Sequence, residues 1–276
     1  MNNDNKIRLT TTLPSYACLP VNRCNLPPQI LGSLTFQRHP VFLEIDGVKI
    51  LHKRLFAMLE ELDDQSQRAR RFMDYMVVQF RLHHLEEAGL EPDEQRGKAD
   101  YLRLLRGWMF NPDGREAAVI KGWVESRFGL LPRYHNGKLH HPEDQTYLCY
   151  LAARAEGLYG ANALEAQLDL LYSYCQYELS KRYQPHQRLT LFRGVNRLED
   201  YDLLTQEKTQ QTVVLLNNIN ACTSCRERAD EFGDLVMEVP APWQKILFYS
   251  HLLPHHVGED EFLLIGGAYE VKLHYW

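Results

Sequence analysis

The sequence predicts an α+β fold in which helices come first and strands follow. Residues from about 50 to 182 carry apolar side chains at helical spacing, whereas residues 186–276 hold short apolar runs separated by Gly, Pro and Asn. A doubly wound sheet would need strands and helices in alternation, and that alternation is missing. No Gly-x-Gly-x-x-Gly follows a predicted strand, so the sequence does not predict a dinucleotide site of the Rossmann kind.

The first 50 residues are predicted to be mostly loop, with one or two short strands. They are rich in Pro and Asn, and Pro27 is followed directly by Pro28. Because proline has no backbone N–H to donate, this pair is predicted to block regular structure.

Two helices are clearest in the helical part, residues 51–182. One is predicted from Asn162 to about Arg182, with Asn162 as its N-cap and Pro185 beyond its end. The other is predicted from Ser66 to Glu87. Each carries a stripe at helical spacing, which predicts contact with a protein core and not with a cofactor. The stripes are Leu164, Leu168, Leu171, Cys175 and Leu179 in the first helix, and Phe72, Tyr75, Met76, Gln79 and Phe80 in the second.

Short strands are predicted after a linker at residues 183–187. Val, Leu, Phe and Tyr dominate each run, which is typical of strands. The whole chain, 1–276, is predicted to be a single domain with a loop-rich segment (1–50), a helical part (51–182) and a β-rich part (186–276). The predicted strands are 188–193, 212–217, 234–239, 245–250, 261–265 and 268–275.

Composition excludes several classes of protein. A chain of 276 residues that is 45% hydrophobic and 24% charged can bury a substantial core. Its net charge of −5 provides no basic field to hold nucleic acid or an anionic membrane. The first residues lack the apolar region of a signal peptide, and no apolar run approaches the ~20 residues of a membrane helix. We therefore expect a cytoplasmic protein with no membrane span and no nucleic-acid partner.

Six cysteines without a secretory signal are predicted to be reduced thiols. Cys222 and Cys225 form a Cys-x-x-Cys pair, which suits redox chemistry or zinc. A zinc ribbon needs a second close pair, and Cys18 and Cys24 have the wrong spacing for it. The paired histidines lack the i, i+4 spacing of helical metal ligands, so no metal is expected. A Cys/His metal-binding protein remains an alternative.

Three short pieces in the last third of the chain suggest a site for a doubly phosphorylated, cationic nucleotide such as NAD. Arg193 ends one predicted strand, and its planar guanidinium suits a pyrophosphate, while Gly194 lets the backbone come close to the ligand. The carboxylate of Glu261 suits the positive charge that develops when a glycosidic bond breaks. Ser224 follows the end of another strand and is expected to hydrogen-bond this carboxylate.

A second carboxylate accompanies Glu261. Glu259 and Glu261 are two residues apart, so in a strand both face one cleft, whereas Asp260 is predicted to point away. Taken singly, each of these features has an ordinary structural interpretation. Arg193 can be an exposed arginine, the acidic pair can belong to a solvated loop, and the hydroxyls of Thr223 and Ser224 can bind local backbone in a turn. Their joint occurrence, in this order and at these strand positions, favours a site.

These residues resemble the signature of the arginine-specific mono-ADP-ribosyltransferases, which is Arg, then Ser-Thr-Ser, then Glu-x-Glu. Cys222-Thr223-Ser224 is followed by Ala229 and Phe232 at similar spacing, and Cys222 departs from the signature by replacing its first serine. The resemblance implies two packed antiparallel sheets that form a cleft for NAD as co-substrate, preceded by helices. Its implied catalytic residues are Glu261 and Glu259, and its implied NAD-binding residues are Arg193, Gly194, Thr223, Ser224 and Phe232.

The front half resembles the dinitrogenase reductase ADP-ribosyltransferase family. That resemblance implies transfer of ADP-ribose to an arginine of dinitrogenase reductase, the iron protein of nitrogenase, and regulation by a PII signalling protein. Because a guanidinium has a pKa above about 12, it is a poor nucleophile, and Glu259 is suited to orient it and take its proton. The segments that carry the resemblance are 22–26, Phe36 with 39–40, 43–48, 55–59 and 72–76.

Three alternatives to this transferase remain open. A NAD glycohydrolase with the same residues would not need Glu259. A non-catalytic binding module would tolerate loss of Glu261. A Cys/His metal protein would carry stoichiometric zinc.

Overall fold

The computed structural model describes residues 13–82, 100–158, 163–205, 211–254 and 260–275, and its helices precede most of its strands. The helices are η1 (Ser15–Ala17), α1 (Pro28–Leu31), α2 (Leu34–Arg38), α3 (Val48–Leu51), α4 (Lys53–Glu60), α5 (Gln65–Phe80), α6 (Tyr101–Phe110), α7 (Arg115–Phe128), α8 (Gln145–Leu158), α9 (Leu164–Arg182), η3 (Leu198–Asp200), α10 (Arg226–Asp230) and η4 (Trp243–Lys245). The strands are β1 (Arg188–Val195), β2 (Asp202–Leu203), β3 (Gln211–Cys222), β4 (Leu235–Pro242), β5 (Ile246–Tyr249) and β6 (Phe262–Tyr275). In the described part of the chain, no helix has the length and apolar character that a membrane crossing requires.

Six strands of the described residues form one antiparallel sheet in the order β1-β4-β6-β3-β2, with β5 paired to β6. The predicted α+β class is therefore confirmed. The two separate sheets that the resemblance implied are instead joined, because β6 pairs with β3 along most of its length, with β5 at its start and with β4 at its end.

Strand β6 also merges the two strands predicted at 261–265 and 268–275. Gly266 and Gly267 lie at the junction, opposite a register shift between Leu216 and Ile219 of β3. A Cβ atom on Gly266 would lie 1.7 Å from the carbonyl oxygen of Asn217, and Gly267 has a φ of 118°. Glycine at both positions therefore lets the strand continue through an irregularity that would otherwise end it.

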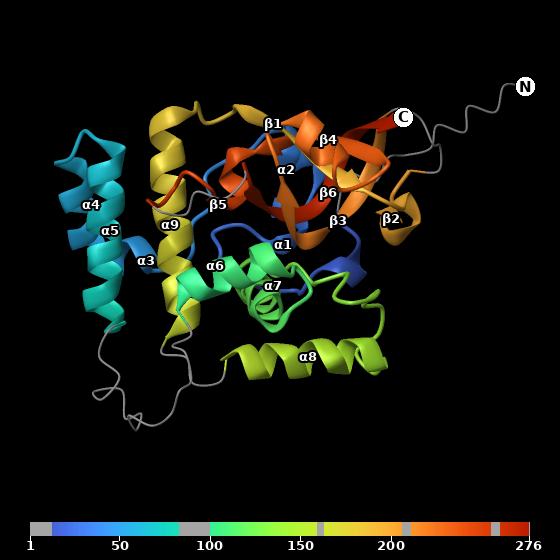
Figure 1. Ribbon diagram of the computed structural model, residues 1–276, viewed down its shortest axis with the longest axis horizontal. Helices are drawn as coiled ribbons and strands as arrows, with labels where there is room; N and C mark the ends of the chain where they lie inside the picture. The colour runs from blue at the N-terminus through green and yellow to red at the C-terminus, as the bar shows by residue number, and fades with distance from the viewer. Residues whose placement is uncertain (1–12, 83–99, 159–162, 206–210, 255–259, 276) are drawn as a thin grey trace, which may run out of the picture.

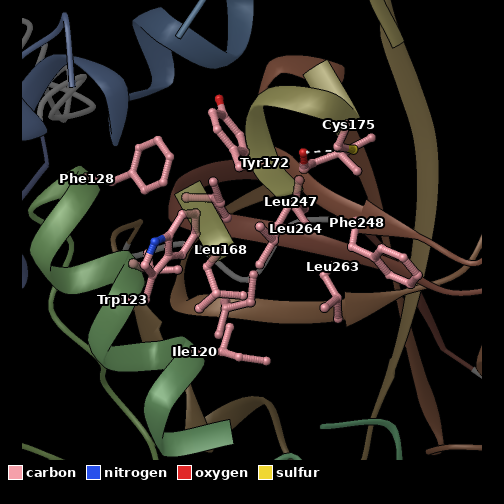
Figure 2. Packing of buried hydrophobic residues seen from close by; sticks show 14 of the residues in the cluster. Ile120, Trp123, Phe128, Leu168, Tyr172, Cys175, Leu247, Phe248, Leu263 and Leu264 are labelled. Carbon is pink, nitrogen blue, oxygen red and sulfur yellow. Dashed lines mark hydrogen bonds between the residues drawn. The ribbon is translucent and has the colours of Figure 1, made fainter. Parts of the chain in front are cut away.

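Helix α9 stands between the α4–α5 pair and the sheet (Figure 1), and its five predicted stripe residues are all buried. The helix begins at Leu164, after Ala163 in the left-handed conformation, and the predicted N-cap Asn162 lies outside the described residues. Figure 2 shows its inner face meeting α7 and the strands β5 and β6. The labelled side chains of this core are Ile120, Trp123, Phe128, Leu168, Tyr172, Cys175, Leu247, Phe248, Leu263 and Leu264.

Helix α5 ends earlier than the sequence predicted. Phe80 is its last residue and Arg81 has a φ of 51°, so the predicted continuation of the helix beyond Phe80 is wrong, and residues 83–87 of the predicted range lie outside the described residues. Phe72, Met76 and Phe80 of the predicted stripe are buried, whereas Gln79 is exposed. The helix is tied to α9 by a two-bond ion pair, in which Arg68 donates to both carboxylate oxygens of Glu178 at 2.7 and 2.9 Å.

The N-terminal segment contains more helix than the sequence predicted. Pro28 is the first residue of α1, so the prediction that Pro27 and Pro28 block regular structure is wrong. Proline suits the first turn of a helix, because its φ is already helical and its missing N–H would have no partner there. Within residues 13–50, the part of this segment that the structure describes, isolated bridges at Cys18 and Cys24 stand in place of the one or two strands expected.

Candidate active site

A cavity of about 580 Å³ lies where β1, the end of β3 and the beginning of β6 meet α6. Arg193, Gly194, Thr223, Phe232 and Glu261 of the predicted site line this cavity. The structure thus brings together residues that are far apart in the sequence.

Two backbone contacts explain why these elements converge. The antiparallel register pairs Cys222 with Phe262, so the residues just after β3 lie opposite those just before β6. Phe192 of β1 and Thr223 form an isolated bridge, with N–H···O distances of 2.7 and 2.9 Å. Strand β1 therefore reaches the site although it is not a sheet neighbour of β3.

The guanidinium of Arg193 is held by two donated hydrogen bonds. Its Nε donates to the hydroxyl of Tyr201 at 3.0 Å, and its Nη1 donates to the carbonyl oxygen of Ala221 at 2.7 Å. The plane of the guanidinium is therefore set before any ligand arrives. A pre-oriented guanidinium loses less conformational entropy when it binds an anion.

Gly194 allows a close approach of protein backbone. A Cβ atom at this position would lie 1.9 Å from the carbonyl oxygen of Ala229 in α10. The structure shows that the glycine admits α10 onto β1, and its predicted role in letting the backbone approach a ligand stays a prediction. This contact places Phe232, just after α10, at the cavity with 59% of its surface exposed.

Glu261 accepts a hydrogen bond from the indole of Trp108, with 3.2 Å between Nε1 and Oε1. Ser250 holds its backbone, because the Glu261 N–H donates to Ser250 Oγ at 2.9 Å and the Ser250 N–H donates to the Glu261 carbonyl at 3.0 Å. Burial raises the pKa of the Glu261 carboxyl, and the Trp108 bond and the charge of Arg193 act in the opposite direction. The site thus combines a partly desolvated carboxylate with a nearby fixed cation.

Ser224 does not make the predicted hydrogen bond to Glu261. Its hydroxyl donates to Asp260 Oδ2, and its backbone N–H donates to the same oxygen at 2.8 Å. The hydroxyl of Thr223 also donates to this oxygen, at 3.2 Å. Asp260 also lines the cavity, so the prediction that it points away from the cleft is wrong. The other predicted acid, Glu259, lies outside the described residues.

Cys222 replaces the first serine of the signature, and it is buried at the end of β3. Burial raises the pKa of its thiol to about 12, against the opposing charge of Arg193. A neutral thiol is a poor nucleophile and a poor metal ligand. Cys225 is exposed, and the described residues contain no group of three or more His, Cys, Asp or Glu side chains arranged to hold a metal ion.

Several cavity residues were missed by the sequence analysis. Trp108 has the position of an ordinary core residue in a helix, and Tyr201 lies in a loop without a recognisable motif. The basic side chains at the cavity come from the loop between α7 and α8, from the segment after β1 and from α10, so no run of charge shows in the sequence. These basic residues are Arg133, Lys138, His140, Arg197 and Arg228.

Comparisons with known proteins found one family model and one relative that match most of the chain. The family model described as dinitrogenase reductase ADP-ribosyltransferase (DRAT) matches residues 21–273. A relative from Rhodospirillum rubrum, named "NAD(+)--dinitrogen-reductase ADP-D-ribosyltransferase", is 35% identical over 268 residues, which are 92% of this chain and 94% of the relative. No solved structure gives a significant match.

Proposed function

The chain belongs to the dinitrogenase reductase ADP-ribosyltransferase family, and from this premise we propose that it transfers ADP-ribose from NAD to an arginine side chain of dinitrogenase reductase. The reaction releases nicotinamide and inactivates the acceptor. One observation carries the proposal: Arg193 and Glu261 line the same cavity, a fixed cation for the pyrophosphate and a carboxylate for the reacting ribose. The cavity of about 580 Å³ also lies within the usual range of ligand sites, roughly 300–1,000 Å³.

Arg193 and Glu261 have separate tasks in this mechanism. The Arg193 guanidinium binds the pyrophosphate oxygens of NAD, and the exposed ring of Phe232 offers a face on which a base can stack. Glu261 accepts a hydrogen bond from the ribose 2′-hydroxyl of the nicotinamide nucleoside. As the glycosidic bond breaks and nicotinamide leaves with the bonding electrons, the carboxylate stabilises the oxocarbenium ion.

The second half of the reaction attaches the ribose to the acceptor. The nitrogen of the acceptor guanidinium attacks the oxocarbenium carbon and must lose a proton. We assign this proton transfer to Glu259, the first acid of the Glu-x-Glu pair, which the resemblance to the arginine-specific transferases implies as catalytic. The assignment remains a prediction, since Glu259 lies outside the described residues.

Two further expectations accompany this function. Regulation by a PII signalling protein follows from the resemblance alone, and we assign no surface to it. A cytoplasmic location likewise remains a prediction from the sequence.

The decisive experiment incubates the purified protein with NAD labelled in the adenylate portion and with purified dinitrogenase reductase. We expect labelled acceptor and one nicotinamide released per ADP-ribose transferred, with mass spectrometry locating the label on an arginine. Equal nicotinamide release with and without the acceptor, together with an unlabelled acceptor, would identify a NAD glycohydrolase instead. Stoichiometric zinc in elemental analysis would favour the metal-protein alternative.

A further inference from the structure

We propose that Trp108 is the positioning residue that holds the carboxylate of Glu261 for reaction, in the place where the sequence led us to expect Ser224. This inference rests on the proposed function, because it presupposes that Glu261 acts on NAD. It adds a residue from the helical part of the chain to the predicted site residues, which all belong to the β-rich part.

The contact itself is specific. An indole has a single N–H, and that of Trp108 donates to Glu261 Oε1 at 3.2 Å. The tryptophan is 3% exposed, yet it lines the cavity. A buried donor with one possible bond fixes the carboxylate orientation more strictly than a hydroxyl that can rotate. Among the described residues no side chain or backbone N–H donates to the other oxygen, Oε2, and we assign this oxygen to the ribose hydroxyl.

Ser224, the donor that the sequence predicted for Glu261, donates to a different carboxylate. The hydroxyl and the backbone N–H of Ser224 both bind Asp260, and the Thr223 hydroxyl binds Asp260 as well. Both hydroxyls of this turn therefore have a carboxylate partner other than Glu261. The structure assigns the task of orienting Glu261 to the indole.

Helix α6 is held firmly enough to serve as a support. At its start, the Asp100 carboxylate accepts from the Arg103 N–H at 2.7 Å, and the Gln167 side chain accepts from the Tyr101 N–H at 3.0 Å. In its middle, a Cβ atom on Gly107 would lie 2.5 Å from the Glu116 side chain, so α6 and α7 are in close contact next to Trp108.

The turn after α6 is also fixed. The buried ammonium of Lys121 donates to the Pro112 carbonyl and to Asp113 Oδ1, each at 2.8 Å. Lys121 also lies 6.0 Å from the centroid of a Trp108 ring. Arg193 and Lys121 are the cations near the carboxylate and the indole. Asp113 and His135 lie against Lys121, and Tyr201 and the neutral Cys222 thiol lie against Arg193, so these four are the titratable groups that act on the two cations.

Trp108→Phe tests the proposal, because it removes the N–H and keeps most of the buried ring. The active form of Glu261 is the carboxylate, and a donated hydrogen bond favours that form. We expect kcat to fall about tenfold, the KM for NAD to stay nearly constant, and the acidic limb of the kcat profile to move up by roughly one pH unit.

Trp123→Phe is the matched control. This tryptophan is also buried, and its indole donates to Asp169 at 2.7 Å in the core drawn in Figure 2. The same substitution there removes a bonded indole N–H away from the cavity. We expect a loss of thermal stability with an unchanged acidic limb, which separates a positioning role from general destabilisation.

A spectroscopic measurement avoids dependence on the folding of Trp108→Phe. Among the four tryptophan indole N–H signals, one is expected to shift as the pH passes through the Glu261 pKa, and this shift should vanish in Glu261→Gln. A wild-type acidic limb and kcat in folded Trp108→Phe, or no titrating indole signal, would overturn the inference. If Glu261→Gln were fully active, the catalytic assignment itself would fail, whichever result Trp108→Phe gave.

Discussion

Asp260 accepts hydrogen bonds from both the hydroxyl and the backbone N–H of Ser224, with 2.8 Å between the backbone nitrogen and Oδ2. The second residue after the end of β3 is thereby tied to the second residue before the start of β6. Because Glu261 follows Asp260 directly, this tie also fixes where the carboxylate of Glu261 enters the cavity. The contact therefore supports the site structurally. It comes from Asp260, which the alternation of side chains in a strand had predicted to point away.

Asp260→Asn should weaken this support, because a neutral amide accepts more weakly than a carboxylate. We expect the free energy of unfolding to fall by about 1 kcal/mol, since the site is partly exposed to solvent, and kcat to fall with it. Chemical denaturation and steady-state transfer assays measure the two effects. Asp234→Asn, at an exposed position, is the control, and an equal effect of both changes would remove the role of Asp260.

The sequence could not show which acid the hydroxyls bind, for a geometric reason. Alternation of side chains holds within a strand, but β6 begins at Phe262, so the rule does not apply to Asp260. The pairing of Cys222 with Phe262 sets Ser224 opposite Asp260, and this register depends on tertiary structure. The role of Trp108 could not be predicted for a similar reason. A tryptophan in a helix is interpreted as a core residue unless its partner, which is distant in the sequence, is known.

Other parts of the fold were predictable because the signal is local. The stripe of α9 is read from one segment, and all five of its residues are buried. The α+β order follows from composition along the chain. The early end of α5 was not predictable, since apolar residues continue beyond Phe80 and Arg81 turns the chain without the usual glycine. The joined sheet depends on two glycines whose effect appears only when β3 lies beside β6.

Arg193→Lys should weaken NAD binding. Lysine can carry the charge, but it cannot bond Tyr201 and Ala221 in the fixed plane that the guanidinium uses. We expect a loss of roughly 1–3 kcal/mol in NAD affinity, measured by calorimetry. Arg188→Lys, an exposed position on the same strand, should leave the affinity unchanged. Wild-type affinity in Arg193→Lys would argue against a pyrophosphate contact.

Protonation of His135 should lower the stability of the folded protein in mild acid. Burial lowers the pKa of its imidazole to about 4, helped by the charge of Lys121 and opposed by Asp113. Its Nδ1 lies 3.2 Å from the Lys121 ammonium, which can donate only to the neutral ring. The unfolded chain has a histidine pKa near 6.5, so stability is complete above pH ~6.5 and is lost as the pH falls toward 4, by about 3 kcal/mol.

Urea denaturation across this pH range tests the assignment. His135→Gln should flatten the dependence of the free energy of unfolding on pH between 6.5 and 4, whatever its effect at neutral pH. His186→Gln changes an exposed histidine and should keep the wild-type dependence. An unchanged slope in His135→Gln would assign the acid sensitivity to other groups.

Substitutions of the two glutamates of the Glu-x-Glu pair should have different effects on nicotinamide release and on protein labelling when both are measured side by side. Glu261→Gln removes the charge that meets the oxocarbenium ion, so both reactions should fall, by ~10²–10³ for loss of one preorganised electrostatic contact. Glu259→Gln should abolish transfer to arginine and spare slow hydrolysis of NAD, because the glycosidic bond can still break. The structural reason is that Glu261 lines the cavity beside Arg193 and accepts from Trp108. Loss of hydrolysis in Glu259→Gln with hydrolysis retained in Glu261→Gln would reverse the two roles.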